Sequence, residues 1–314
     1  MSHLWRLVTA VSLVSVVAVA AACGPSSPPV AATGTASGTA PIAAPIAVLG
    51  AENFYADLLV QIGGSRVAAT SLLNDPTEDP HAFEASPQAA KAVADARLVI
   101  VNGLGYDEFM NKLLDASPRP GRVVIDVQQV TGAKDDANAH LWYDPRTMPL
   151  VAEAAAAALT ALEPRSAAYF ADRKASYQAS LQRITDKIGA LKATYAGAPV
   201  AFTEPVAEYL AAAIGLTVLT PPGFMEAIEK GVDPAPADVA AERALLTGRK
   251  VKALLYNSQV TSPLTTGIRE LAVQHGVPVV GVAETIPPTA RTFVQWQLAQ
   301  LDDLERALAK PSAP

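Results

Sequence analysis

Two histidines and one glutamate follow predicted β-strands, at positions where ligand-binding groups commonly gather. His81 lies in the stretch DPHAFE after the β-rich run RVAATSLL, and His140 lies in NAHLWYDP after the run RVVIDV. Glu204 directly follows a third β-rich run, in AFTEPVAEYL. Ligands of open parallel sheets collect at the carboxyl ends of the strands. These three side chains are therefore predicted to converge on one site.

The chemistry of this set is that of a transition-metal site. Neutral imidazole nitrogens and a carboxylate suit Zn, Mn, Fe, Co or Ni, whereas Ca and Mg prefer shells of oxygen ligands. Taken singly, each residue also has an ordinary interpretation, because most histidines are hydrogen-bonded or surface side chains and a glutamate before a helix is favoured by the positive helix end. His275 keeps that ordinary interpretation, since it precedes Gly276 at a predicted helix end.

The elements that must position these residues alternate between strand and helix. Runs such as RLVIVNG and KVKALLYN are each followed by a helical stretch, a pattern typical of parallel sheets covered by helices on both faces. Between them lies an alanine-rich helical region with a predicted break at Glu163-Pro164, because proline ends a helix. We expect an α/β protein of two lobes with the metal site in the cleft between them: an N-terminal lobe at 46–145, a connecting helical region at 146–196 and a C-terminal lobe at 197–314.

The first 45 residues predict export and attachment to a membrane. Residues 1–22 combine a positively charged start, an apolar run and small residues, as in a signal peptide. Cys23 is the only cysteine, which excludes a disulfide within the chain. It resembles the lipid-bearing cysteine of a bacterial lipobox, and residues 23–45 are then a lipid-anchored flexible linker of Pro, Ala, Ser, Gly and Thr. Cleavage at an Ala-x-Ala site would instead give a soluble secreted or periplasmic protein.

The charge of the chain favours a cationic ligand. The formal net charge is −6 at pH 7, and no basic stripe of the kind that binds nucleic acid is present in the sequence. Nucleic acid is therefore not an expected partner.

With these motifs the chain resembles the zinc and manganese solute-binding proteins of bacterial ABC transporters, the cluster A-I metal-binding family, many of which are lipoproteins. The resemblance implies that His81 and His140 ligate the metal, that Glu204 is the third ligand, and that the long helix is a rigid backbone that limits lobe movement. Ala139 stands where the family usually has proline. The resemblance covers nearly the whole mature chain, and its most specific pieces are EDPHAFEASP, VNGLGYDEFMNKLL, NAHLWYDP, FTEPVAEYLA and VKALLYNSQVTSPLTTGIRELAVQHGVPVVGVAETIPP.

The fourth ligand departs from the pattern of many relatives. These carry an aspartate in an E-S-S-V-D stretch, whereas this chain reads NSQVT at residues 257–261, without a carboxylate. Glu284, at the end of the neighbouring run VVGVAE, is the expected replacement. Gln259, Thr261, Glu52 or water are the alternatives, and Glu52 is also a candidate to orient an imidazole by accepting its second N–H.

Three functions are compatible with this set of residues. The first is an extracytoplasmic binding protein, expected to be a monomer, that delivers Zn²⁺ or Mn²⁺ to the membrane permease of an ABC importer. The second is an exported metal-dependent hydrolase, although the sequence contains no H-E-x-x-H or G-x-S-x-G motif. The third is capture of a metal chelate such as a siderophore, haem or cobalamin. Binding without catalysis is the favoured interpretation, and the residues alone leave zinc and manganese both open.

Overall fold

The computed structural model describes residues 44–75 and 83–310, all of which fall within one compact unit. The predicted signal peptide, most of the predicted linker, Cys23 and His81 lie outside the described residues.

The first sheet has four parallel strands in the order β2-β1-β3-β4. Alternate residues of its central strands enter different cores: Val48 and Leu98 pack in the cluster that contains α1, whereas Leu49 and Val99 pack with α2 and α3. Both faces are thus covered, as the apolar runs predicted. The strands are β1 (Ile46–Glu52), β2 (Val67–Leu73), β3 (Leu98–Val101) and β4 (Val123–Asp126), and the helices are α1 (Asn53–Gly63), α2 (Pro87–Asp95), α3 (Phe109–Ala116) and α4 (Val127–Thr131).

The second sheet repeats this arrangement, with parallel strands in the order β6-β5-β7-β8. Phe202 and Leu255 face the same core as α11, whereas Ala201 and Leu254 pack against α8, α9 and α10. The strands are β5 (Pro199–Phe202), β6 (Thr217–Val218), β7 (Ala253–Asn257) and β8 (Val279–Val282), and the helices are α7 (Glu208–Ile214), α8 (Pro222–Glu229), α9 (Pro236–Thr247), α10 (Pro263–Gln274) and α11 (Phe293–Leu308). We call the first sheet with α1–α4 the first lobe, and the second sheet with α7–α11 the second lobe.

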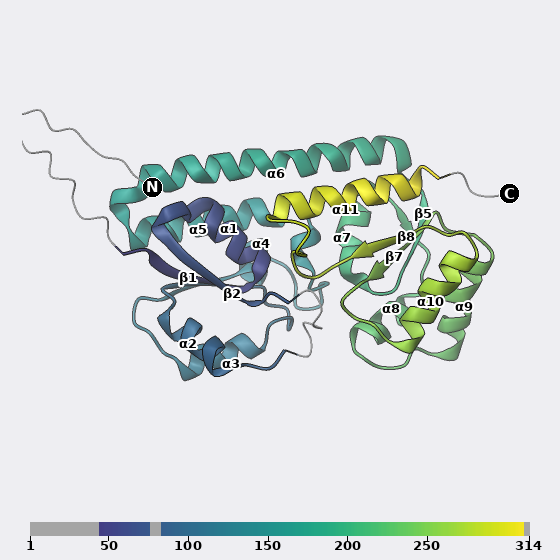
Figure 1. Cartoon of the computed structure of the whole chain (residues 1–314), viewed down its shortest axis with the longest axis horizontal. Helices are drawn as coiled ribbons and strands as arrows, with labels where there is room; N and C mark the ends of the chain where they lie inside the picture. Colours follow the sequence, from purple (N-terminus) through teal and green to yellow (C-terminus); the bar gives the residue numbers. More distant parts are fainter. Residues whose placement is uncertain (1–43, 76–82, 311–314) are drawn as a thin grey trace, which may run out of the picture. The chain divides into compact units, whose positions relative to one another are not determined.

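Two helices connect the lobes, α5 (Thr147–Leu162) and α6 (Ala167–Tyr195), separated by a short 3-10 turn at Pro164–Ser166. The break therefore falls at the predicted proline. The 29 residues of α6 extend over about 44 Å at 1.5 Å per residue. This helix packs against α1 of the first lobe and against α7 and α11 of the second, and Figure 1 shows it lying along both. Its buried residues recur at intervals of three, four or seven positions, as expected for one apolar face: Phe170, Tyr177, Leu181, Ile184, Ile188 and Leu191.

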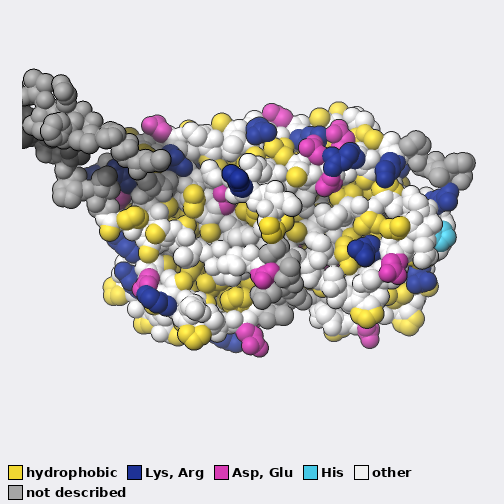
Figure 2. All heavy atoms as spheres, in the orientation of Figure 1, with side chains coloured by type: hydrophobic (Ala, Val, Ile, Leu, Met, Phe, Trp, Pro, Cys, Tyr) yellow, Lys and Arg dark blue, Asp and Glu magenta, His cyan; other side chains and the backbone are white. Residues whose placement is uncertain are grey.

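One apolar cluster contains residues of both sheets together with α5, α6 and α11. The predicted α/β fold, with two parallel sheets and a long helix, is thereby confirmed. Within the described ranges, none of the helices is both long enough and apolar enough to span a membrane. On the face shown in Figure 2, basic and acidic side chains are interspersed among apolar and neutral ones.

A buried acid in α9 makes the stability of the protein depend on pH. Glu242 has no exposed surface. Burial raises the pKa of Glu242 from 4.5 to about 7, and the neighbouring Thr220 hydroxyl offsets part of this increase. Because the folded state holds this proton more tightly than the unfolded state, the stability that it contributes is present below about pH 4.5 and is lost as pH rises through about 7.

Glu242→Gln removes this titration. We expect the difference in unfolding free energy, variant minus wild type, to increase by about 2 to 3 kcal/mol from pH 4.5 to pH 8, because only the wild type loses stability through this group. Urea unfolding across this pH range measures the difference, and any constant effect of the buried amide cancels. Glu270→Gln, at an exposed position of α10, is the control and should follow the wild type. A Glu242→Gln profile parallel to that of the wild type would contradict the assignment.

Candidate metal centre

His140 is held rigidly in the interior. It directly precedes a 3-10 turn at Leu141–Tyr143, and its side chain has no exposed surface. The rings of Tyr106 and Trp142 lie edge-on to the imidazole, with centroid separations of 5.8 Å and 5.2 Å. Such packing leaves the imidazole little freedom to rotate.

Asn138 determines which imidazole nitrogen carries the proton. Its Oδ1 accepts a hydrogen bond from the His140 backbone N–H at 2.9 Å, and its Nδ2 donates to the carbonyl oxygen of Pro205 at 2.7 Å. The His140 backbone N–H can only donate a hydrogen bond, and the Pro205 carbonyl oxygen can only accept one. The Asn138 amide therefore has one possible orientation. Because Oδ1 also lies 2.8 Å from His140 Nδ1, Nδ1 must be the protonated nitrogen. In the neutral imidazole the lone pair is therefore on Nε2.

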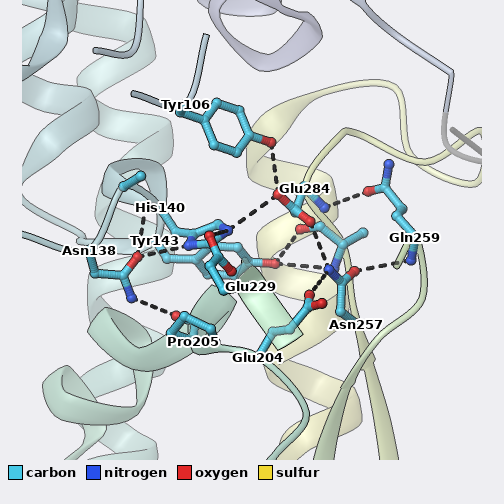
Figure 3. Close-up of polar contacts among 12 residues, drawn as sticks. Tyr106, Asn138, His140, Tyr143, Glu204, Pro205, Glu229, Asn257, Gln259 and Glu284 are labelled. Atoms are coloured by element: carbon cyan, nitrogen blue, oxygen red, sulfur yellow. Dashed lines mark hydrogen bonds and ion pairs between the residues drawn. The ribbon is translucent and has the colours of Figure 1, made fainter. Parts of the chain in front are cut away.

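The Nε2 atom faces a carboxylate of the other lobe. Glu284 Oε2 lies 3.3 Å from His140 Nε2 and accepts a hydrogen bond from the Tyr106 hydroxyl at 2.9 Å. Figure 3 shows Tyr106 and His140 of the first lobe directed at this one carboxylate. A lone pair and a carboxylate oxygen are both acceptors, so their contact requires a proton or a metal cation between them.

Asn257 connects Glu284 to the second predicted carboxylate. Its Nδ2 donates to Glu284 Oε1 at 2.7 Å and also donates to Glu204 Oε2. Its Oδ1 accepts from the backbone N–H of Gln259, which fixes the orientation of the amide. Glu204 is 2% exposed, and among the described residues no group donates a hydrogen bond to its Oε1.

Two of the predicted ligands have raised pKa values, although the hydrogen bond from Asn257 by itself lowers the pKa of Glu204. Burial raises the pKa of Glu204 to about 8, reinforced by the charges of Glu284 and Glu229. Burial alone would lower the pKa of His140. The hydrogen bond to Glu284 and the surrounding carboxylates outweigh that effect and leave the pKa of His140 above its ordinary value. His140 and Glu204 thus hold their protons more strongly than free side chains do, as expected where carboxylates are buried together.

The alternative fourth ligands Gln259, Thr261 and Glu52 differ from Glu284 in their hydrogen bonds and burial. The Oε1 atom of Gln259 accepts hydrogen bonds from the backbone N–H groups of Glu284 and Thr285, so this side chain holds the loop that carries Glu284. Thr261 is exposed. Glu52 is buried at the end of β1, where burial and then the charge of Asp107 raise its pKa well above the ordinary value.

Among the sequence-predicted ligands, His140, Glu204 and Glu284 are brought together. His81 lies outside the described residues. In the described part of the chain, no three His, Cys, Asp or Glu side chains are already spaced to hold a metal ion. Instead, His140 contacts Glu284 directly, and Asn257 lies between Glu284 and Glu204.

Sequence reasoning missed Glu229, whose Oε1 lies 3.9 Å from His140 Nε2. It is the last residue of α8, a helix that was not predicted. Signals for this helix are present in the sequence, because Pro222 occupies its first turn and the buried Phe224, Met225 and Ile228 follow a helical spacing.

Two asparagines of the site were also missed. Asn138 contacts His140 only two residues away, but the orientation of its amide depends on Pro205, 67 residues away. The carboxylate partners of Asn257 are 53 and 27 residues away. Local sequence patterns contain no signal for pairs at such separations.

A family model described as the periplasmic component A of the zinc-uptake complex matches residues 48–307. The matched region includes both sheets, apart from the first two residues of β1, and every described residue of the site.

Curated proteins with significant similarity align over part of their length. A manganese-binding lipoprotein of Halalkalibacterium halodurans is 27% identical over 137 residues, which are 42% of this chain and 45% of that protein. A high-affinity zinc uptake system protein of Haemophilus ducreyi is 26% identical over 164 residues, 40% of this chain and 52% of that protein. The chain thus matches about half the length of these relatives.

Solved structures with the same fold align over almost their whole length. The periplasmic zinc-binding protein TroA from Treponema pallidum superposes with a TM-score of 0.72 at 20% identity, covering 85% of this chain and 99% of that one. The binding protein FpvC from Pseudomonas aeruginosa, solved in complex with Mn²⁺, gives a TM-score of 0.67 at 20% identity, covering 84% and 98%. At these identities the likeness establishes the fold.

The double hydrogen bond from Asn257 gives a test of the site itself. Asn257→Asp replaces a donor shared by two buried carboxylates with a third carboxylate of the same shape. We expect the free energy of unfolding at pH 7.5 to fall by roughly 2 to 4 kcal/mol, measured by urea denaturation. Asn111→Asp, at an exposed position of α3, makes the same chemical change as a control. Equal losses in the two variants would show that Asn257 does not hold the carboxylates together.

Proposed function

The chain belongs to the family of the periplasmic component A of zinc-uptake complexes, and from this membership we propose that it captures a divalent transition-metal ion outside the cytoplasm. It then delivers the ion to the membrane permease of an ABC importer. The ion is cargo, and the protein performs no reaction on it.

The observation that carries this proposal is the contact between His140 Nε2 and Glu284 Oε2 at 3.3 Å. Because Nδ1 carries the proton that Asn138 Oδ1 accepts, Nε2 of the neutral imidazole has a free lone pair. This lone pair and those of Glu284 Oε2 are directed at the same point. A metal ion with a preference for nitrogen and carboxylate ligands satisfies both at once. The bond formed there would replace the proton that the pair otherwise shares.

We assign four ligands to the ion. His140 and Glu284 form the described centre, and Glu204 adds a buried carboxylate whose Oε1 accepts no hydrogen bond from the described residues. His81 is proposed on its sequence motif alone. On this proposal, binding involves shifts of these side chains from their present contacts: Glu284 contacts His140, and Asn257 joins Glu284 to Glu204.

The proposed cargo is Zn²⁺ or Mn²⁺. Imidazoles suit zinc and carboxylates suit manganese, and the assigned set contains two of each. The names of the relatives support both ions, because one is called manganese-binding and another a zinc uptake protein.

We further propose that the protein acts as a monomer tethered to the cell membrane. A lipid on Cys23, followed by the linker predicted from the composition of residues 24–45, would hold the folded part near the permease while leaving it free to reorient. The name of the manganese-binding relative, a lipoprotein, supports this arrangement.

The two alternative functions have less support. A metal-dependent hydrolase needs an open coordination position and a group placed for proton transfer, whereas the family is described as an uptake component. Binding of a metal chelate needs room for an organic ligand. The described candidate ligands, His140, Glu204 and Glu284, instead lie within hydrogen-bonding distance of one another or of Asn257.

His140→Ala tests the proposed cargo. We expect this substitution to reduce the affinity for Zn²⁺ and Mn²⁺ by at least roughly 100-fold, because a ligand is lost where even an outer hydrogen-bond partner contributes about 10- to 100-fold. Isothermal titration calorimetry of the purified protein with each ion measures the loss.

His275→Ala is the matched control, since this histidine follows α10 at its C-terminal cap. It should bind both ions like the wild type. Circular dichroism should show that both variants are folded. A folded His140→Ala variant with wild-type affinity would remove the proposed site.

A further inference from the structure

Glu229 lies at the solvent boundary of the candidate centre. Its side chain is 21% exposed, whereas those of His140 and Glu284 have no exposed surface. Its Oε1 is 3.9 Å from His140 Nε2, the atom that Glu284 approaches from the other side at 3.3 Å. Figure 3 shows Glu229 beside the imidazole, between His140 and Glu204. An ion that arrives from solvent would meet this carboxylate first.

The fold directs Glu229 to this point. Residues Phe224, Met225 and Ile228 of α8 are buried, and Met225 belongs to the same core cluster as Trp142. With this face buried, the helix ends beside the His140 loop. The charge of Glu229 correspondingly contributes to the raised pKa of His140, Glu204 and Tyr106.

An ordinary surface role does not account for this placement. The C-terminal end of a helix carries partial negative charge and disfavours a carboxylate, and the Glu284 carboxylate contacts the same Nε2 atom. Glu226, one turn earlier in α8, is exposed and lies 3.4 Å from Lys230 Nζ. A divalent cation bound beside Nε2 would offset the repulsion that Glu229 experiences.

We infer that Glu229 is an additional ligand of the cargo ion, on the solvent side of the centre. Its carboxylate attracts the ion from solvent and remains bound to it beside His140 Nε2. This inference rests on the proposed function. It adds a third carboxylate to Glu204 and Glu284 and makes the ligand set rich in oxygen. Carboxylates suit Mn²⁺ better than softer ions. Glu229 therefore shifts the selectivity of the site toward manganese.

Glu229→Gln tests this role because it keeps the shape of the side chain and removes the charge and one oxygen acceptor. We expect the affinity for Mn²⁺ to fall by roughly 10- to 100-fold, and the affinity for Zn²⁺ to fall less. The association rate of Mn²⁺ at low ionic strength should also decrease, because an exposed carboxylate at the entrance attracts cations. Competition with a chelator gives the affinities, and stopped-flow measurements give the rates.

Two further variants sharpen the test. Glu226→Gln removes an exposed carboxylate from the same helix and should leave both affinities and the rate unchanged. Glu229→Asp keeps the charge on a shorter side chain, so it should retain the fast association while losing part of the affinity for Mn²⁺. Thermal unfolding of each variant verifies that the fold is intact.

The outcomes separate this inference from the proposed function. A wild-type protein that binds neither ion overturns the proposed function. Binding that is lost in His140→Ala but unchanged in Glu229→Gln overturns only the role of Glu229. Equal losses for Mn²⁺ and Zn²⁺ in Glu229→Gln would overturn the selectivity.

Discussion

The contact between His140 Nε2 and the Glu284 carboxylate is the constraint on which the centre depends. Asn138 accepts a hydrogen bond from Nδ1, so the neutral imidazole presents only a lone pair to Glu284 at 3.3 Å. Burial makes this arrangement costly, because two acceptors in a medium of low dielectric constant cannot satisfy each other. A cation between them removes the cost. The surrounding residues must therefore hold both groups in place whether a proton or a metal ion lies between them.

The interface between the lobes supplies this restraint on both sides of Glu284. The Tyr143 hydroxyl donates to the carbonyl oxygen of Ala283 at 2.7 Å, and Asn53 pairs with both the N–H and the carbonyl oxygen of Ile286, at 2.8 Å and 3.1 Å. First-lobe side chains thus hold the second-lobe backbone next to the carboxylate. Together with α6, which packs against both lobes, these bonds oppose a wide opening, so exchange of the ion is expected to involve side chains and short loops.

How far the centre could be predicted depends on the kind of signal that each residue leaves. Glu204 and Glu284 follow strands of the second sheet, and the rule that parallel strands present their carboxyl ends at one edge brings these two together. His140 belongs to the first lobe, so its place beside them followed from the predicted two-lobe arrangement and the family resemblance. Asn138 acts on His140, two residues along the chain, but the orientation of its amide is fixed only by Pro205 of the other lobe. Asn257 leaves no local signal, because its carboxylate partners are 53 and 27 residues away. Glu229 was missed for a different reason: α8 has only eight residues, so its helical spacing extends over few positions even though Pro222 marks its first turn. The long helix was the most predictable element, since its break at Pro164 follows from backbone chemistry.

The charges of the site explain why an asparagine, and not a fourth acid, lies between Glu204 and Glu284. The three carboxylates of Glu204, Glu229 and Glu284 carry one negative charge each when ionised, and a divalent ion offsets two of these. An acid at position 257 would leave a larger excess charge in a buried place, at a cost that the ion could not offset. The Asn257 amide instead donates to both buried carboxylates without adding charge. It links the two carboxylates that we propose as ligands of one ion, while Glu229, whose side chain is partly exposed, carries a charge that water can screen.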